Sequence, residues 1–185
     1  MMNARELRQE AAKRRSIGVD SEFGTIPSSV VYLDEHLRKA SSLDDKHLLF
    51  ALIIGECIRA ENHVAEIHFL RRQMTELPLQ PVFLTSLASA LASNPNTVPE
   101  AFARCEEAVQ LAQHENRQVR YCLTCQVRLA LTFDKYEILS SALRNLIADA
   151  GHERVEDTNY EFDFIDQIDD RRIDPELLRQ YKALA

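Results

Sequence analysis

Two cysteines three positions apart are the first residues whose types and spacing could carry chemistry. Cys122 and Cys125 form a C-x-x-C pair, a spacing found in thiol redox motifs and in one half of many zinc sites. Zinc would require two further ligands, and the chain has no second C-x-x-C and no nearby H-x-x-x-H. Cys122, Cys125 and Leu129 also follow the i, i+3, i+7 spacing of one helical face, and free cysteine is often buried. Core packing is therefore the favoured interpretation.

A second cluster, in the segment ENHVAEIHF, suggests metal binding or acid–base chemistry. His63 and Glu66 could share a helical face, whereas His68, five positions after His63, lies well round the helix. A solvated helical face is expected instead. The chain has no glycine-rich phosphate-binding motif, and its four glycines are scattered singly. We therefore expect no cofactor and assign no catalytic or metal-binding residue.

Charge and composition exclude several classes of function. The 185 residues carry a net charge of -7, which opposes a general role on nucleic acid because phosphate binding requires a basic face. The longest apolar run, at 48–55, is too short to span a bilayer, and the N-terminus lacks the apolar core of a signal peptide. Cysteines among apolar neighbours fit a reducing compartment. We expect a soluble, cytoplasmic protein with no nucleic-acid or membrane partner.

The elements that would position these residues are helices. A helical pattern returns three times, with helix pairs opening near Asp45, Val82 and Arg120. The pairs are expected at 45–60 with 62–76, 82–93 with 98–114, and 118–132 with 134–149. No stretch shows sustained strand-like alternation. The pattern predicts an all-α fold in which antiparallel helical hairpins stack as a short solenoid; an irregular helical bundle is the alternative.

Three regions are expected along the chain. Residues 1–26 contain a basic N-terminal arm that we predict to be flexible. Residues 27–150 form the helical repeat domain, which begins with a helix at 27–40. Residues 151–185 form an acidic tail that also carries aromatic residues. The tail ends in a short helix with Asp174 as its cap and Pro175 at its first position.

The second helix pair carries a resemblance to a known family. Large, large, small and large residues recur in its first helix and small residues in its second, at Leu84, Leu87, Ala88, Leu91, Ala101 and Ala108. Because of these residues, the segment 45–149 resembles the tetratricopeptide repeats, a family of stacked helical hairpins that mostly mediate protein binding. Cys105 departs from the pattern, because the family usually has an aromatic residue there. The resemblance implies a stack whose curve is set by close helix approach at the small residues, and a protein or peptide partner.

The resemblance also implies a concave groove, lined by first-helix side chains that face away from the second helices. Those positions are Leu48, Leu52, Thr85, Ser89, Leu123 and Val127. None of them is Lys, Arg or Asn, the residues with which some members of the family grip a terminal carboxylate. A partner helix or an extended apolar segment is therefore expected. The alternative is that some of these leucines lie in the core, under the N-terminal helix or the tail.

The acidic tail supplies the other candidate site. Tyr160, Phe162 and Phe164 alternate with other residues in a segment rich in acids, which gives apolar anchors within a charged stretch. We hypothesise that the tail docks over the groove in the free protein and is displaced by a partner. Attraction between the acidic tail and the basic arm, within one molecule or between two, is the alternative.

The function expected from the sequence is a non-catalytic protein–protein interaction module. It would bind a helical or extended apolar segment of another protein in the groove. Two alternatives stay open: a type III-like secretion chaperone of the small acidic repeat class, and a helical metal-dependent enzyme that uses His63, Glu66 or the cysteines. The nearly all-apolar helix at 47–58 also leaves self-association as a homodimer open.

Overall fold

The computed structural model describes residues 4–149 and 172–183, and within them the predicted all-α fold is confirmed. Nine α-helices in these residues account for most of the structure, with one short 3-10 helix and one two-stranded hairpin beside them. The elements in chain order are α1 Ala4–Arg14, β1 Gly18–Ser21, β2 Gly24–Pro27, α2 Ser28–Leu37, α3 Leu43–Arg59, α4 His63–Glu76, α5 Pro81–Leu91, η1 Pro95–Thr97, α6 Val98–Glu115, α7 Val119–Thr132, α8 Tyr136–Asp149 and α9 Pro175–Lys182.

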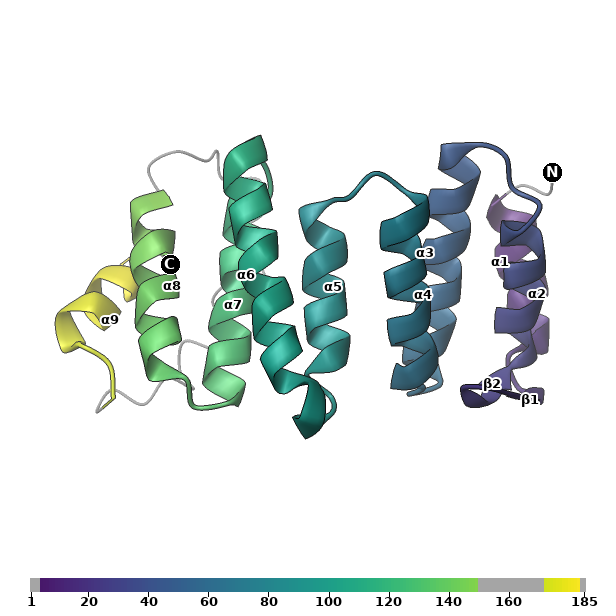
Figure 1. Cartoon of the computed structure of the whole chain (residues 1–185), viewed down its shortest axis with the longest axis horizontal. Coiled ribbons are helices and arrows are strands. Elements are labelled where there is room, and N and C mark those ends of the chain that lie inside the picture. Colours follow the sequence, from purple (N-terminus) through teal and green to yellow (C-terminus); the bar gives the residue numbers. More distant parts are fainter. Residues whose placement is uncertain (1–3, 150–171, 184–185) are drawn as a thin grey trace.

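The helices stand side by side in an elongated row that follows the chain order (Figure 1). Each helix packs on the next from α1 to α9, and α5 also packs on α7. Helices α1 and α2 form one end of the row, and α9 forms the other (Figure 1). Neighbours along the chain are therefore neighbours in space, so that short-range contacts dominate the packing.

Local signals in the sequence set several helix ends. The side-chain oxygen of Ser42 accepts a hydrogen bond from the backbone N–H of Asp45 and begins α3, and the side chain of Asn62 begins α4 in the same way. Asp174 caps α9 by accepting from the N–H of Glu176, with Pro175 at the first helical position, as the sequence predicts. These caps satisfy backbone donors that the helix itself leaves unpaired.

The core consists of three apolar clusters that follow one another along the row. The first extends from α1 to α5, the second from α4 to α7, and the third from α5 to α9. Small residues on the second helices of the predicted pairs are completely buried, at Ala65, Ala101, Ala108 and Ala142. Short side chains at these points let adjacent helices approach closely.

The N-terminal segment differs from the sequence prediction. Residues 4–26 do not form a free arm, because α1 packs on α2 and buries Leu7 and Ala11 completely or nearly so. Strands β1 and β2 pair in antiparallel register, with Val19 opposite Ile26, and the turn between them uses Gly24 at a φ of 81°. Two apolar residues four positions apart hold an otherwise basic helix against the row.

The opposite end of the chain is described in part. Residues 150–171, which include Tyr160, Phe162 and Phe164, lie outside the described residues, so the docking hypothesis for the tail stays a prediction. The terminal helix α9 is present and buries Leu177, Leu178 and Tyr181 against the third cluster. Its amphipathic face closes the far end of the row.

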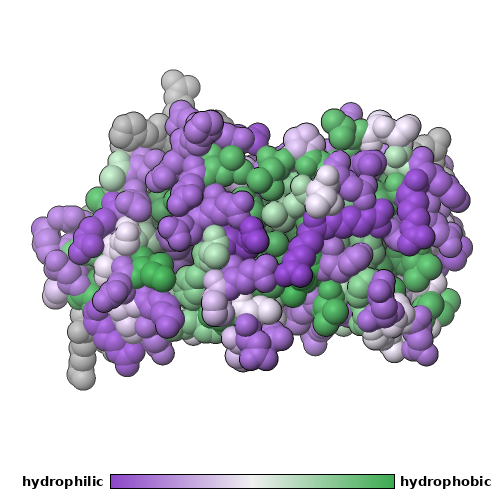
Figure 2. Space-filling model, in the orientation of Figure 1, coloured by the Kyte–Doolittle hydropathy of each residue, from purple (hydrophilic) through white to green (hydrophobic). Residues whose placement is uncertain are grey.

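The surface mixes hydrophilic and apolar side chains. Hydrophilic residues cover most of the face shown in Figure 2, and apolar residues lie between them in small patches rather than in one continuous patch. No helix in the described part of the chain is long and apolar enough to cross a membrane.

Candidate functional site

Three of the six predicted groove positions lie in the core. Thr85 is 1% exposed, and Leu123 and Val127 are 0% exposed. They therefore cannot contact a partner on the surface of this structure, which corrects that part of the groove prediction. The remaining positions are accessible to different degrees: Leu48 and Leu52 are half-buried and Ser89 is exposed.

The direction of each side chain on α7 explains the correction. Leu123 and Val127 are one helical turn apart and pack into the third apolar cluster with Leu139 and Leu143 of α8. This stripe faces the helix that follows rather than the surface. A helix turns by about 100° per residue, so residues two positions away from this stripe lie on nearly the opposite side.

An open surface does cross α5 and α7, and it contains different residues. Tyr121 is 51% exposed, Cys125 is half-buried one turn later, and Arg128 follows on the same side of α7. From α5, the Ser89 Oγ lies 3.8 Å from the Cys125 Sγ. We call Ser89, Tyr121, Cys125 and Arg128 the α5–α7 face. It places an aromatic ring, a hydroxyl, a thiol and a guanidinium on two helices in direct contact.

The cysteines divide into buried residues and one that reaches the surface. Cys57, Cys105 and Cys122 are completely buried, as the core interpretation predicts, whereas Cys125 is half-buried. Burial raises the pKa of Cys57 and of Cys122 to about 12. The C-x-x-C pair therefore points in two directions, with one thiol in the core and the other toward α5. Among the described residues, no group of three or more His, Cys, Asp or Glu is arranged to hold a metal ion.

The Cys125 thiol has close polar neighbours. Its Sγ donates toward the backbone oxygen of Thr85 at 3.9 Å, and the residue packs against the apolar cluster that contains Cys105 of α6. The neighbouring Cys105 thiol lowers the pKa of Cys125, against the effect of burial, and the Ser89 hydroxyl and the positive charge of Arg128 act in the same direction. The pKa of Cys105 is raised by the Cys125 thiol and by burial. The thiolate is thus favoured at Cys125 rather than at Cys105.

The two histidines of the segment ENHVAEIHF have different partners, as the sequence indicates. His63 Nδ1 lies 3.0 Å from Glu66 Oε2, one turn along α4. His68 instead stacks against Phe23 of the hairpin, with ring centroids 4.5 Å apart. His68 therefore helps to seat the hairpin and does not complete a site with His63.

A buried carboxylate on α3 fastens the N-terminal elements. Glu56 is 2% exposed and accepts two hydrogen bonds from Arg15, both at 2.8 Å, one from Ser29 at 2.9 Å, and one from Arg59. Burial alone would raise its pKa, but these partners lower the pKa of Glu56 to about 2. Sequence reasoning missed this cluster, although a single acid within the apolar run LIIGECI was a signal that it needs a buried partner.

A second ionic cluster joins α2, α3 and α4. Arg72 of α4 donates to Asp34 of α2 and to Glu76, each at 2.5 Å, and Lys46 of α3 donates to Glu76 at 3.0 Å. The Arg72 guanidinium also lies over the Phe50 ring, 5.9 Å from its centroid. One arginine therefore connects three helices through charge and packing together.

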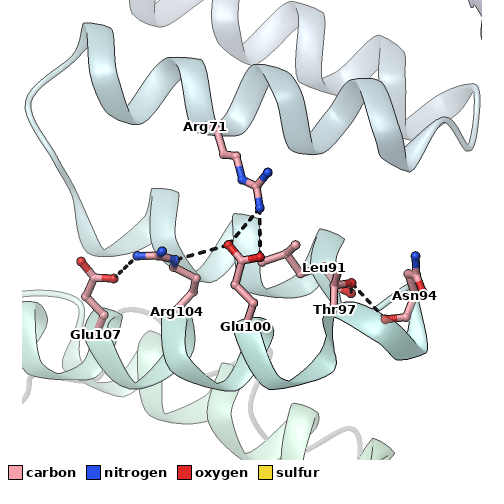
Figure 3. Close-up of polar contacts among 7 residues, drawn as sticks. All are labelled: Arg71, Leu91, Asn94, Thr97, Glu100, Arg104 and Glu107. Atoms are coloured by element: carbon pink, nitrogen blue, oxygen red, sulfur yellow. Dashed lines mark hydrogen bonds and ion pairs between the residues drawn. The ribbon is translucent and has the colours of Figure 1, made fainter. Parts of the chain in front are cut away.

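A third ionic cluster continues this connection from α4 to α6. Figure 3 shows Arg71 of α4 pointing toward Glu100 near the start of α6, where it donates to both carboxylate oxygens at 2.9 Å. Arg104, one turn further along α6, lies between Glu100 and Glu107 and donates to Glu107 at 2.7 Å. The ion pairs link α2 to α4 and α4 to α6, while the α5–α7 face lies on the helices between and after them.

The turn that leads into α6 is fixed by its own polar contacts. The Thr97 hydroxyl donates to the backbone oxygens of Leu91 at 2.5 Å and Asn94 at 3.0 Å (Figure 3). These bonds hold the end of α5 against the start of α6. Glu100 is thereby held where Arg71 reaches it.

Comparison of the chain with protein-family models, with curated proteins and with solved structures finds no match. The resemblance to tetratricopeptide repeats therefore stays a prediction from the sequence.

Proposed function

We propose that this chain is a non-catalytic protein-interaction module that binds a helical or extended segment of another protein. The observation that supports the proposal is the α5–α7 face. Tyr121 is half-exposed one turn before Cys125 on α7, and Ser89 of the adjacent α5 contacts Cys125. Aromatic side chains next to small polar groups are typical of residues that dominate binding energy, because the ring buries a large area with little loss of rotational freedom.

The framework around this face supports the same proposal. The Arg72 cluster ties α4 to α2, and Arg71 ties α4 to α6. These contacts fix α4 and α6, the two helices that pack on α5 from either side. A surface that is already ordered loses less entropy on binding, which favours affinity. An elongated row of helices also offers contacts along the length of a bound segment.

The proposal is tested by capture from native lysate followed by titration of the purified partner. Tyr121→Ala removes the aromatic ring, and Ser89→Arg places a bulky charge on the same face. We expect either change to weaken binding by about tenfold or more, as for a central aromatic contact. Val64→Ala is the matched control, since Val64 is 62% exposed on α4, outside the α5–α7 face.

Circular dichroism would first establish that each variant keeps its helical content. A partner that binds wild type and both face variants with equal affinity would contradict the proposal. Light scattering of the protein alone distinguishes a second copy of the chain from a different protein as the occupant. A homodimer that dissociates on Tyr121→Ala would identify self-association as the role of the face.

A further inference from the structure

Strand β1 forms an open edge of the hairpin at Gly18 and Asp20. The backbone N–H of Ser28 donates to the oxygen of Ile17 at 2.7 Å, so these two residues form a hydrogen-bonded pair. Bonded and non-bonded pairs alternate along an antiparallel ladder. The pairs that contain Gly18 and Asp20 are therefore non-bonded within the hairpin, and the backbone N–H and C=O groups of both residues point away from β2.

The two edges of the hairpin differ in their hydrogen bonds. On β2, the backbone oxygen of Thr25 accepts from the Asn62 side chain at 3.3 Å, and Pro27 has no N–H to offer. On β1, no group in the described part of the chain bonds to the backbone of Gly18 or Asp20. Both residues are exposed, and the hairpin lies at the same end of the row as α1 and α2 (Figure 1). We call the backbone groups of Gly18 and Asp20 the β1 edge.

We propose that the β1 edge pairs with the β1 edge of a second copy of this chain, in antiparallel register about a two-fold axis at Val19. This register places Gly18 of each copy opposite Asp20 of the other, so that outward-facing residues meet on both sides of the axis. Each of these pairs exchanges two N–H···O=C bonds. The two hairpins then form one four-stranded sheet, which is more stable than an isolated pair of strands.

The side chains of β1 suit a second copy as the partner strand. Val19 is 37% exposed and lies directly opposite Val19 of the other copy, where two β-branched side chains stabilise the pairing. A charged residue commonly protects an edge strand from pairing, but in this register Asp20 faces Gly18, which has no side chain. The Asp20 carboxylate also accepts a hydrogen bond from the Thr25 hydroxyl at 3.1 Å within its own hairpin. The edge is thus self-complementary, as a two-fold interface requires.

This pairing is separate from the α5–α7 face. It uses different elements and is measured on the protein alone, so it does not rest on the proposed function. A strand of four residues buries a small area, so we expect a weak dimer whose population rises with protein concentration.

Sedimentation equilibrium of the full-length protein, at concentrations up to about 1 mM, measures the dimer. Asp20→Pro should weaken it by about tenfold or more, because proline removes the outward N–H and places its ring at the edge. Asp20→Asn keeps the N–H and is the matched control, which should dimerise as wild type does. Tyr121→Ala should also leave this dimer intact, which separates the β1 edge from self-association through the α5–α7 face.

Disulfide trapping tests the register. The two Val19 residues form a non-bonded pair with Cα atoms about 4.5 Å apart, a distance that a disulfide spans. Val19→Cys should therefore give a covalent dimer under mild oxidation, above the background of wild type with its four native cysteines. Ile17→Cys is the matched control, because Ile17 is 55% exposed on the same face of the strand. Its two copies are about 13 Å apart along the strands in this register, beyond the reach of a disulfide.

Three results would each overturn the proposal. The first is a wild-type protein that stays monomeric over the whole concentration range. The second is equal dimerisation of Asp20→Pro and Asp20→Asn, and the third is equal trapping of Val19→Cys and Ile17→Cys. The trapping result decides the question even where the proline variant fails to fold.

Discussion

Replacing Glu56 with glutamine should destabilise the protein strongly and in a pH-dependent way. The carboxylate is 2% exposed and accepts hydrogen bonds from Arg15, Ser29 and Arg59. Burial opposes ionisation, and these partners more than offset it, so that the pKa of Glu56 falls from 4.5 to about 2. An amide of the same shape keeps the volume filled but cannot pair with two guanidinium groups.

The size of the stability loss follows from the lowered pKa of Glu56. A tenfold change in the proton dissociation constant corresponds to about 1.4 kcal/mol, so a fall from 4.5 to about 2 contributes about 3 kcal/mol to the free energy of unfolding at pH 7. Because the folded-state pKa lies below the unfolded value, this contribution is present in full above about pH 5.5 and is lost as the pH falls toward 2. At pH 3 about half of it remains.

Urea unfolding followed by circular dichroism measures this prediction. Wild type should exceed Glu56→Gln by about 3 kcal/mol at pH 7 and by about 1.5 kcal/mol at pH 3, because at pH 3 Glu56 is already protonated in the unfolded chain but still ionised in the folded protein. The control is Glu10→Gln, which removes an exposed pair with Lys13 and should change stability little. Equal stability at pH 7, or a difference that does not change with pH, would refute the assigned role of Glu56.

Two further substitutions test the packing of the row by the same unfolding assay. Leu7→Ala should lower the free energy of unfolding by about 3 kcal/mol because the side chain is completely buried, whereas Arg8→Ala, at an exposed position, should lower it little. Equal effects of the two changes would support the flexible arm predicted from the sequence. Arg72→Met keeps the aliphatic stem but leaves Asp34 and Glu76 without their shared donor, for an expected loss of about 2 kcal/mol. Unchanged stability of the methionine variant would show that this cluster contributes no net energy.

Helix positions were largely predictable because their signals are local. Asp174 and Pro175 mark the start of α9 within two residues of sequence, and the small residues Ala101 and Ala108 indicate a buried face by their spacing alone. Capping and periodicity act within one or two turns of a helix. Such features can be identified without knowledge of the tertiary structure.

Contacts between distant residues were not predictable in the same way. Arg15 and Glu56 are 41 positions apart, and the spacing of either residue gives no indication of the other. The strands Gly18–Ser21 and Gly24–Pro27 are only four residues each, too short for an alternating pattern to stand out from a loop. The two buried apolar residues of α1, Leu7 and Ala11, were likewise obscured by the charged residues around them.

The error in the predicted groove has a physical cause that also indicates where binding should be sought. The repeat phase implied by the family resemblance places Leu123 and Val127 of α7 in a concave groove. In a helix packed on both sides, however, an apolar stripe stabilises the fold more when it is buried against the neighbouring helices than when it faces solvent. Both residues are buried in this way, at 0% exposure. The surface of α7 is found where the stripe is interrupted, at Tyr121 and Cys125. We therefore expect the binding face of this row at its exposed aromatic residue, Tyr121, rather than along the continuous apolar stripe of α7.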